Sequence, residues 1–227
     1  MTQPQLDFER ARFNMIEQQI RPWEVIDQTV LDLLAVVKRE EFVPPAFRAL
    51  AFVDTEIPLK LDGRDTGETM LAPRVEARTL QGLGLRNSDL VLEIGTGSGY
   101  MAALLAHLAR HVTTVEILPE LHAFAEANLR RSGVTNVKAT VGDGAQGYSL
   151  GHELDVIVLS GAVPAVPDAF LQQLRIGGRL AAIVGVDPAM SLQIITRTGP
   201  ASFSTVKLFE TRAKPLRNVA KPSRFRF

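Results

Sequence analysis

The residues best suited to bind a ligand form a glycine-rich turn after a short apolar run. Residues 89–99 read Asp-Leu-Val-Leu-Glu-Ile-Gly-Thr-Gly-Ser-Gly, and the helix formers of residues 100–109 follow directly. A strand, a glycine turn and the start of a helix together direct backbone N–H groups at a nucleotide-like ligand. The glycines are spaced G-x-G-x-G, whereas a dinucleotide fingerprint is G-x-G-x-x-G, so a NAD-dependent oxidoreductase is disfavoured.

A second acidic residue stands where a ribose-binding carboxylate is expected. The apolar segment 111–115 ends at Glu116, which follows Gly99 by 116 − 99 = 17 residues. This is close to the spacing of about 20 residues that such an acid has in nucleotide-binding folds. A carboxylate at this place accepts hydrogen bonds from both ribose hydroxyls. A glycine turn without any ligand is the alternative, and Glu116 makes it the less favoured one.

The elements that must position these residues alternate between strands and helices. Strands are predicted at residues 90–94, 111–115, 137–141, 154–159 and 179–184, and helices at residues 73–83, 100–109, 119–131 and 167–174. This alternation predicts an α/β fold, with a doubly wound, mostly parallel sheet and helices on both faces. Residues 192–198 and 205–210 are expected to close the sheet as an antiparallel pair. Residues 7–50 are expected to form a helical cap, and residues 51–73 read as irregular chain and a polar loop.

Composition excludes several classes of protein. The chain has 25 basic and 25 acidic residues, and this balance argues against a nucleic-acid partner bound by phosphate neutralisation. No apolar run approaches the ~18 residues needed to cross a bilayer, and the first residues do not resemble a signal peptide. Cysteine is absent, and the four histidines show no metal-ligand spacing. We therefore expect a cytoplasmic protein with no membrane partner and no metal.

Five segments carry a more specific resemblance. They read Met-Ile-Glu-Gln-Gln-Ile-Arg (15–21), Arg-Glu-Glu-Phe-Val-Pro (39–44), Val-Leu-Glu-Ile-Gly-Thr-Gly-Ser-Gly-Tyr (91–100), Val-Gly-Asp-Gly (141–144) and Ile-Gly-Gly-Arg-Leu (176–180). In this order they resemble the protein-L-isoaspartate O-methyltransferases, over nearly the whole chain. The resemblance implies a class I methyltransferase fold and S-adenosyl-L-methionine as cofactor, with S-adenosyl-L-homocysteine as product. It also implies methyl transfer to a carboxylate of damaged aspartyl residues in a protein or peptide.

The resemblance places the cofactor site at the strand ends. The glycine turn would line the methionine end and the ribose, Glu116 would hold the ribose hydroxyls, and Asp143 with Gly144 would meet the adenine. Ser160 stands near the place of the sulfonium. The complete set of expected cofactor-binding residues is Glu93, Gly95, Thr96, Gly97, Ser98, Gly99, Glu116, Ile117, Asp143, Gly144 and Ser160.

The acceptor side departs from the family. Residues 67–73 read Gly-Glu-Thr-Met-Leu-Ala-Pro, where the family typically has Gly-Gln-Thr-Ile-Ser-Gln-Pro. Leu71 therefore takes the position of the family's active-site serine, Ala72 that of the next glutamine, and Met190 that of a second glutamine near the last strands. Thr69 is retained, either for a catalytic role or as the N-cap of the following helix. These losses predict weak or absent activity on isoaspartyl peptides.

Two other functions stay open at this point. One is a family member with a different acceptor, such as a small molecule with an apolar portion, and the other is a non-catalytic module that binds S-adenosyl-L-methionine. Glu116 and Asp143 argue against the second, because a scaffold has no need of them. We expect residues 1–72 to form the helical cap and acceptor loop, residues 73–212 the Rossmann-like domain, and residues 213–227 a solvated basic tail. The sequence does not indicate the oligomeric state.

Overall fold

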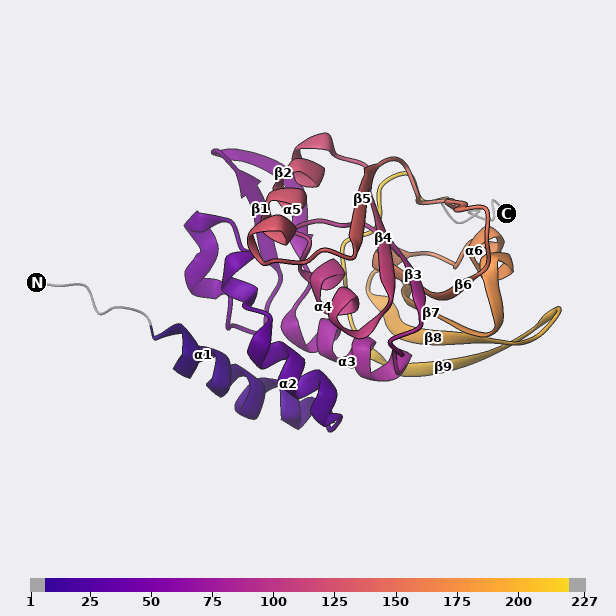
Figure 1. Ribbon diagram of the computed structural model, residues 1–227, viewed down its shortest axis with the longest axis horizontal. Coiled ribbons are helices and arrows are strands. Elements are labelled where there is room, and N and C mark those ends of the chain that lie inside the picture. Colours follow the sequence, from indigo (N-terminus) through magenta and orange to yellow (C-terminus); the bar gives the residue numbers. More distant parts are fainter. Residues whose placement is uncertain (1–6, 221–227) are drawn as a thin grey trace, which may run out of the picture.

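The computed structural model describes residues 7–220 and is built around a seven-stranded sheet with the order β5-β4-β3-β6-β7-β8-β9 (Figure 1). The strands are β3 (Leu90–Ile94), β4 (His111–Glu116), β5 (Val137–Val141), β6 (Leu154–Val163), β7 (Leu174–Val186), β8 (Ala189–Gly199) and β9 (Ser202–Glu210). Strands β3 to β7 pair in parallel, and β7-β8 and β8-β9 are antiparallel. The predicted α/β fold with an antiparallel closing pair is confirmed.

Helices cover both faces of this sheet, because successive strand residues bury their side chains on opposite sides. Val91 of β3 belongs to the apolar cluster that includes residues of α3 (Pro73–Leu83), α4 (Tyr100–Leu108) and α5 (Pro119–Arg131). Its neighbour Leu92 belongs to the opposite cluster, which contains Phe170 of α6 (Asp168–Gln173). Within residues 7–220, none of the helices combines the length and the apolar character needed to cross a bilayer.

The N-terminal segment is helical, as predicted, and packs beside α3 and α4 (Figure 1). Its elements are α1 (Phe8–Met15), the π-helical turn η1 (Ile16–Ile20), η2 (Arg21–Trp23), α2 (Gln28–Val36), η3 (Arg39–Glu41) and η4 (Pro45–Leu50). The Asp27 side chain caps α2 by accepting a hydrogen bond from the Thr29 backbone N–H at 2.9 Å. Met15 and Leu34 are buried in the same cluster as Val91, so these helices share their core with the sheet.

The segment expected to be an irregular loop is instead an antiparallel hairpin of β1 (Ile57–Leu61) and β2 (Arg64–Met70). Ile57 and Leu59 are fully buried and alternate with more exposed residues, which is the period of a half-buried strand. Asp62 and Gly63 both have positive φ, at 49° and 78°. An Asp-Gly pair with two positive φ angles is favoured in tight hairpins, so the sequence contained a turn signal that the loop prediction overlooked.

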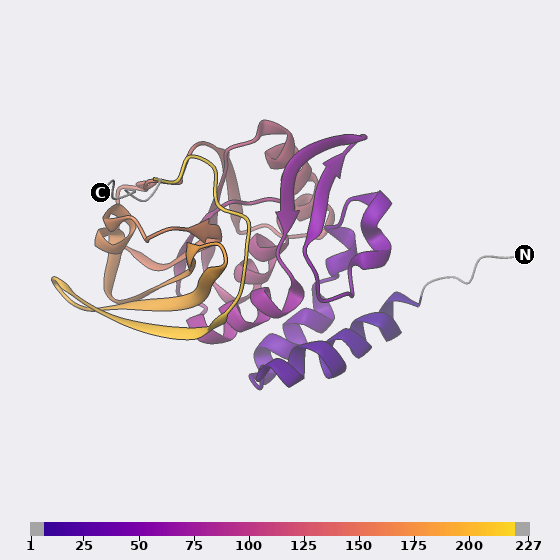
Figure 2. The ribbon, with the colours of Figure 1, turned by 180° about the vertical axis from the view of Figure 1, so that it is seen from behind.

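The chain after β9 is not the solvated tail that was expected. We call residues 212–219 the strap. Figure 2 shows this yellow segment leaving the end of β9 and passing beside the β1-β2 hairpin. Its backbone pairs with the end of β6, because the Ala162 N–H donates to the Lys214 carbonyl at 2.9 Å and the Leu216 N–H donates to the Ala162 carbonyl at 3.0 Å. The basic residues Lys221, Arg224 and Arg226 lie outside the described residues.

Candidate active site

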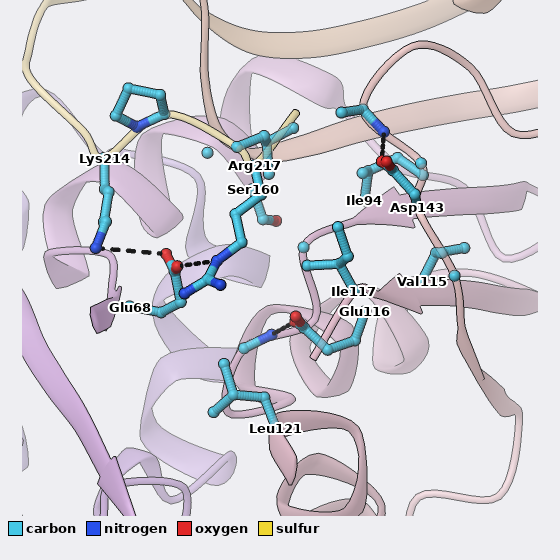
Figure 3. Close-up of a pocket in the computed structure, with 18 of the residues that line it drawn as sticks. Glu68, Ile94, Val115, Glu116, Ile117, Leu121, Asp143, Ser160, Lys214 and Arg217 are labelled. Carbon is cyan, nitrogen blue, oxygen red and sulfur yellow. Dashed lines mark hydrogen bonds and ion pairs between the residues drawn. The ribbon is translucent and has the colours of Figure 1, made fainter. Parts of the chain in front are cut away.

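A pocket opens where the carboxyl ends of β3, β4, β5 and β6 meet the hairpin and the strap (Figure 3). From β3 the chain proceeds to β4 on one side and later returns to β6 on the other, so the pocket lies at a topological switch point. Ligands of open α/β sheets bind at such points. The predicted residues that line it are Thr69, Leu71, Gly95, Gly97, Glu116, Ile117, Asp143, Gly144 and Ser160.

The glycine turn both lines the pocket and packs against α5. Gly95 lines the pocket with a φ of 91°, and a Cβ atom there would lie 3.0 Å from Cδ2 of Leu216. Gly99 lies away from the pocket and allows close packing on α5, because a Cβ there would lie 3.2 Å from the Ala125 Cβ. Thr96 and Ser98 are also buried outside the pocket lining, and the Thr96 hydroxyl lies 2.6 Å from that of Thr114.

Glu116 ties the glycine turn to the end of β4. One carboxylate oxygen accepts a hydrogen bond from the Gly97 N–H at 2.8 Å and the other accepts one from the Leu118 N–H at 3.0 Å. Burial raises the pKa of Glu116, and these backbone donors oppose that shift. A carboxylate has about four lone-pair sites, so its two oxygens can still accept hydrogen bonds from a ligand in the pocket.

A second carboxylate, that of Asp143, lines the same pocket, and Figure 3 shows apolar side chains between it and Glu116. Asp143 accepts hydrogen bonds from the Ala145 N–H at 3.1 Å and from the Asn218 side-chain amide at 2.8 Å. The apolar side chains, which form a slot in the pocket, are those of Ile94, Val115, Ile117 and Leu121. Two acceptors beside an apolar slot suit a flat, hydrophobic group that carries donors at both ends, as an adenosine does.

Glu93 lies behind the pocket and does not line it. It has no exposed surface, and it accepts hydrogen bonds from the Ser160 hydroxyl at 2.8 Å and from the Thr114 hydroxyl at 2.7 Å. Burial raises the pKa of Glu93 to about 8, so the carboxyl is mostly neutral at pH 7. Glu93 therefore orients Ser160 at the pocket wall. The direct contact with the ligand that the sequence predicted for Glu93 is a different role.

On the acceptor side, the three departures from the family lie together. Leu71 packs against the apolar cluster that contains Ala72 and Met190. The Leu71 side chain lines the pocket without offering a donor, and its carbonyl accepts a hydrogen bond from the Arg39 guanidinium at 2.7 Å. The N-capping alternative for Thr69 is wrong, because its hydroxyl donates to Glu56 at 3.1 Å and the N-cap residue of α3 is Ala72.

The sequence interpretation missed the contribution of the strap to this pocket. Lys214, Leu216 and Arg217 line it beside Glu68, and Asn218 is bonded to Asp143. The Arg217 guanidinium donates to a Glu68 carboxylate oxygen and to the Thr66 carbonyl, both at 2.7 Å. One sequence signal existed, because Ala213, Leu216 and Val219 recur every three residues in the basic segment and are less exposed than the residues beside them.

Comparison with known proteins agrees with this geometry. A sequence model of the family Protein-L-isoaspartate(D-aspartate) O-methyltransferase (PCMT) matches residues 10–219. A protein-L-isoaspartate O-methyltransferase of Methanoculleus marisnigri is 41% identical over 84% of this chain and 84% of its own, and one of Rhodopseudomonas palustris is 40% identical over 89% and 91%. A candidate enzyme of that name from Plasmodium falciparum, crystallised with S-adenosyl-L-homocysteine, has the same fold, with a TM-score of 0.75, 20% identity and coverage of 94% and 99%.

Proposed function

This chain belongs to the protein-L-isoaspartate(D-aspartate) O-methyltransferase family, and on that basis we propose that it transfers a methyl group from S-adenosyl-L-methionine to the carboxylate of an isoaspartyl residue in a protein or peptide. The observation that carries the proposal is that Glu116 and Asp143 line one pocket at the switch point of the sheet, with apolar side chains between them (Figure 3). A structural scaffold has no use for two carboxylates placed in this way.

The pocket fits the cofactor in shape and in donor chemistry. Gly95 and Gly97 line the pocket and have no Cβ atoms, so the turn presents bare backbone to the ligand. Glu116 would accept the ribose hydroxyls, and Asp143 would accept the adenine amine in place of the Asn218 amide that it now binds. Ser160, held by Glu93, would lie beside the methionine end. The bound cofactor supplies an electrophilic methyl group.

Methyl transfer to a carboxylate requires the protein mainly to position the acceptor. A carboxyl group has a reference pKa near 4, so the acceptor is already ionised at neutral pH and needs no general base. The protein must hold the carboxylate in line with the methyl group and keep water out. The pocket wall contributed by Thr69 and Leu71 is where the acceptor would lie, next to the end of β6.

The test is transfer of labelled methyl from S-adenosyl-L-methionine to an isoaspartyl peptide, with the normal aspartyl peptide as control. We expect label in the isoaspartyl peptide alone, at a rate below that of a family member with serine at the position of Leu71. Cofactor binding without transfer to any carboxylate would instead identify a non-catalytic binding module. A relative with serine at the position of Leu71, assayed beside this protein, calibrates the rate.

A second candidate acceptor is favoured by one observation. Leu71 lines the pocket and packs against the apolar cluster that contains Ala72 and Met190, so the wall is apolar at the position where the family has serine. An acceptor with an apolar portion next to its carboxylate would suit this wall. Label transferred to a small carboxylate with an aliphatic chain, and not to the isoaspartyl peptide, would establish this alternative.

A further inference from the structure

The acceptor loop lacks a donor at Leu71, but the strap brings a cation to the same pocket. We propose that the Lys214 ammonium holds the acceptor carboxylate and thereby determines the specificity for ionised acceptors. This inference rests on the proposed function, because it names the residue that would position its substrate. Lys214 and Leu71 line one pocket although they lie far apart in the sequence. Figure 3 shows the Lys214 side chain pointing toward Glu68.

Lys214, Arg217 and Glu68 line this pocket together. Of the two cations, only Arg217 forms a hydrogen bond with the Glu68 carboxylate. Arg217 donates to Glu68 at 2.7 Å and to the Thr66 carbonyl at 2.7 Å, so its guanidinium clamps the strap to the hairpin. The Lys214 Nζ lies 3.8 Å from the nearer Glu68 oxygen, which is beyond hydrogen-bond distance. Its side chain is 43% exposed and has three donors to offer.

The formal charge of this cluster matches the proposed acceptor. Glu68 balances one of the two cations, so the group of Glu68, Lys214 and Arg217 keeps a charge of about +1 at neutral pH. An isoaspartyl residue presents one free carboxylate at its branch point, with a charge of about −1. The carboxylates of Glu116 and Asp143 already accept hydrogen bonds from their own surroundings and face the cofactor slot.

The backbone of Lys214 is held beside the end of β6. Its carbonyl accepts the Ala162 N–H at 2.9 Å, two residues beyond Ser160 in β6. A Cβ atom on Gly67 would lie 3.5 Å from the Lys214 Nζ, so the ammonium rests against the acceptor hairpin. The ammonium can therefore reach a carboxylate that lies between the hairpin and the end of β6 by rotation of its own side chain.

Methyl transfer changes the charge of the group that Lys214 is proposed to hold. The bond from the cofactor sulfur to the methyl carbon breaks, and a bond from the methyl carbon to a carboxylate oxygen forms. The sulfonium becomes a neutral thioether and the carboxylate becomes a neutral ester. The ester carries no charge and no longer forms an ion pair with the Lys214 ammonium, so the product binds more weakly than the substrate.

The experiment compares Lys214→Met with Lys207→Met in the full-length protein. Lys207 lies on β9, pairs with Glu210 at 3.0 Å and does not line the pocket, so its replacement controls for the loss of a surface charge. We expect Lys214→Met to raise the KM for an isoaspartyl peptide by about ten- to a hundredfold, the range of a lost charge-assisted hydrogen bond. The Kd for S-adenosyl-L-homocysteine should change less than about twofold, because no direct contact with the cofactor is assigned to Lys214.

A binding measurement separates this inference from the proposed function. The unmodified protein, saturated with S-adenosyl-L-homocysteine, should bind the isoaspartyl peptide more tightly than the peptide whose free carboxylate is an amide, and Lys214→Met should remove that preference. Normal KM and normal preference in Lys214→Met, in a protein that does methylate the peptide, would overturn the inference alone. Lys214-dependent binding without any transfer would overturn the proposed function alone. A protein that neither binds nor methylates the peptide overturns both.

Discussion

The cofactor half and the acceptor half of the pocket are built in different ways. The cofactor half takes most of its residues from one stretch, Gly95 to Gly144, at the ends of three neighbouring strands. The acceptor half joins the hairpin to the strap, and its ion pair between Glu68 and Arg217 links residues 149 positions apart. The first half follows from local sequence and sheet topology, whereas the second exists only when the hairpin and the strap, which are far apart in the sequence, have come together.

The acceptor half also depends on a charge buried in the core. The Arg39 side chain is almost fully buried, pairs with Glu76 and lies over the Tyr100 ring at 4.9 Å from its centroid. The same guanidinium donates to the Leu71 carbonyl at 2.7 Å and so fixes the acceptor loop. The part of the pocket lining between Gly95 and Gly144 contains no such cation. Its two carboxylates, Glu116 and Asp143, accept hydrogen bonds from backbone and amide donors instead.

The largest expected effect follows from removing that cation. Arg39→Met leaves Glu76 buried without its partner, and we expect the free energy of unfolding to fall by about 3–5 kcal/mol, as for other broken buried pairs. Chemical denaturation of the two proteins measures it. The exposed pair Arg21–Glu17 provides the control, because Arg21→Met should cost less than about 1 kcal/mol.

A double variant tests the cause. Arg39→Met combined with Glu76→Leu removes the unpaired charge, so it should recover much of the stability lost in the single variant. If the double variant is no more stable than Arg39→Met, the loss comes from packing and from the Leu71 contact, and the buried charge is not what supports the acceptor half.

The second prediction concerns the buried carboxyl of the cofactor half. Burial holds the pKa of Glu93 at about 8 against an ordinary value of 4.5, so the folded protein keeps a proton that the unfolded chain releases. The stability associated with Glu93 is therefore fully present below pH 4.5 and is lost as the pH rises toward 8. Between pH 5 and 8 this amounts to at most about 4 kcal/mol, at 1.36 kcal/mol per pKa unit.

Glu93→Gln should flatten this dependence, because the amide stays neutral and can still bond the hydroxyls of Ser160 and Thr114. Denaturation curves at pH 5, 6.5 and 8 measure the slope, and Glu120→Gln on the exposed start of α5 is the control. A residual slope of the same sign is expected from Glu76, whose pKa burial raises to about 7 despite Arg39. An unchanged slope in Glu93→Gln would show that Glu93 is already ionised in the folded protein.

The same division explains what the sequence could predict. Strands 90–94 and 137–141 and the helix 119–131 were predicted with the bounds that the structure has, because apolar runs, Pro and Gly act locally. The sequence of the strap alone indicates a solvated tail, since its partners Glu68 and Asp143 lie 149 and 75 residues away. The role of Glu93 was missed for the same reason, because Ser160 is 67 residues distant.

The third prediction separates the two halves by function. Glu116→Ala should weaken binding of S-adenosyl-L-homocysteine by about 1–3 kcal/mol, roughly five- to 150-fold in Kd, the usual cost of lost charge-assisted hydrogen bonds. Titration calorimetry measures it, with Glu120→Ala as the control. At saturating cofactor the KM for the acceptor should stay the same. A change in acceptor KM as large as the change in cofactor Kd would mean that the halves are not independent.

The smallest expected effect comes from restoring a donor to the acceptor loop. Leu71→Ser together with Ala72→Gln returns the residues typical of the family, and we expect kcat/KM for an isoaspartyl peptide to rise by up to about tenfold, the value of one or two neutral hydrogen bonds. Leu71→Ala with Ala72→Gln is the matched control, because it opens the same space without the hydroxyl. The gain should be larger in the Lys214→Met background, which lacks the ammonium proposed to hold the carboxylate. If the kcat/KM of the unmodified protein already equals that of a relative with serine at this position, Leu71 does not lower the activity. Lys214 and the pocket wall at Thr69 would then position the acceptor.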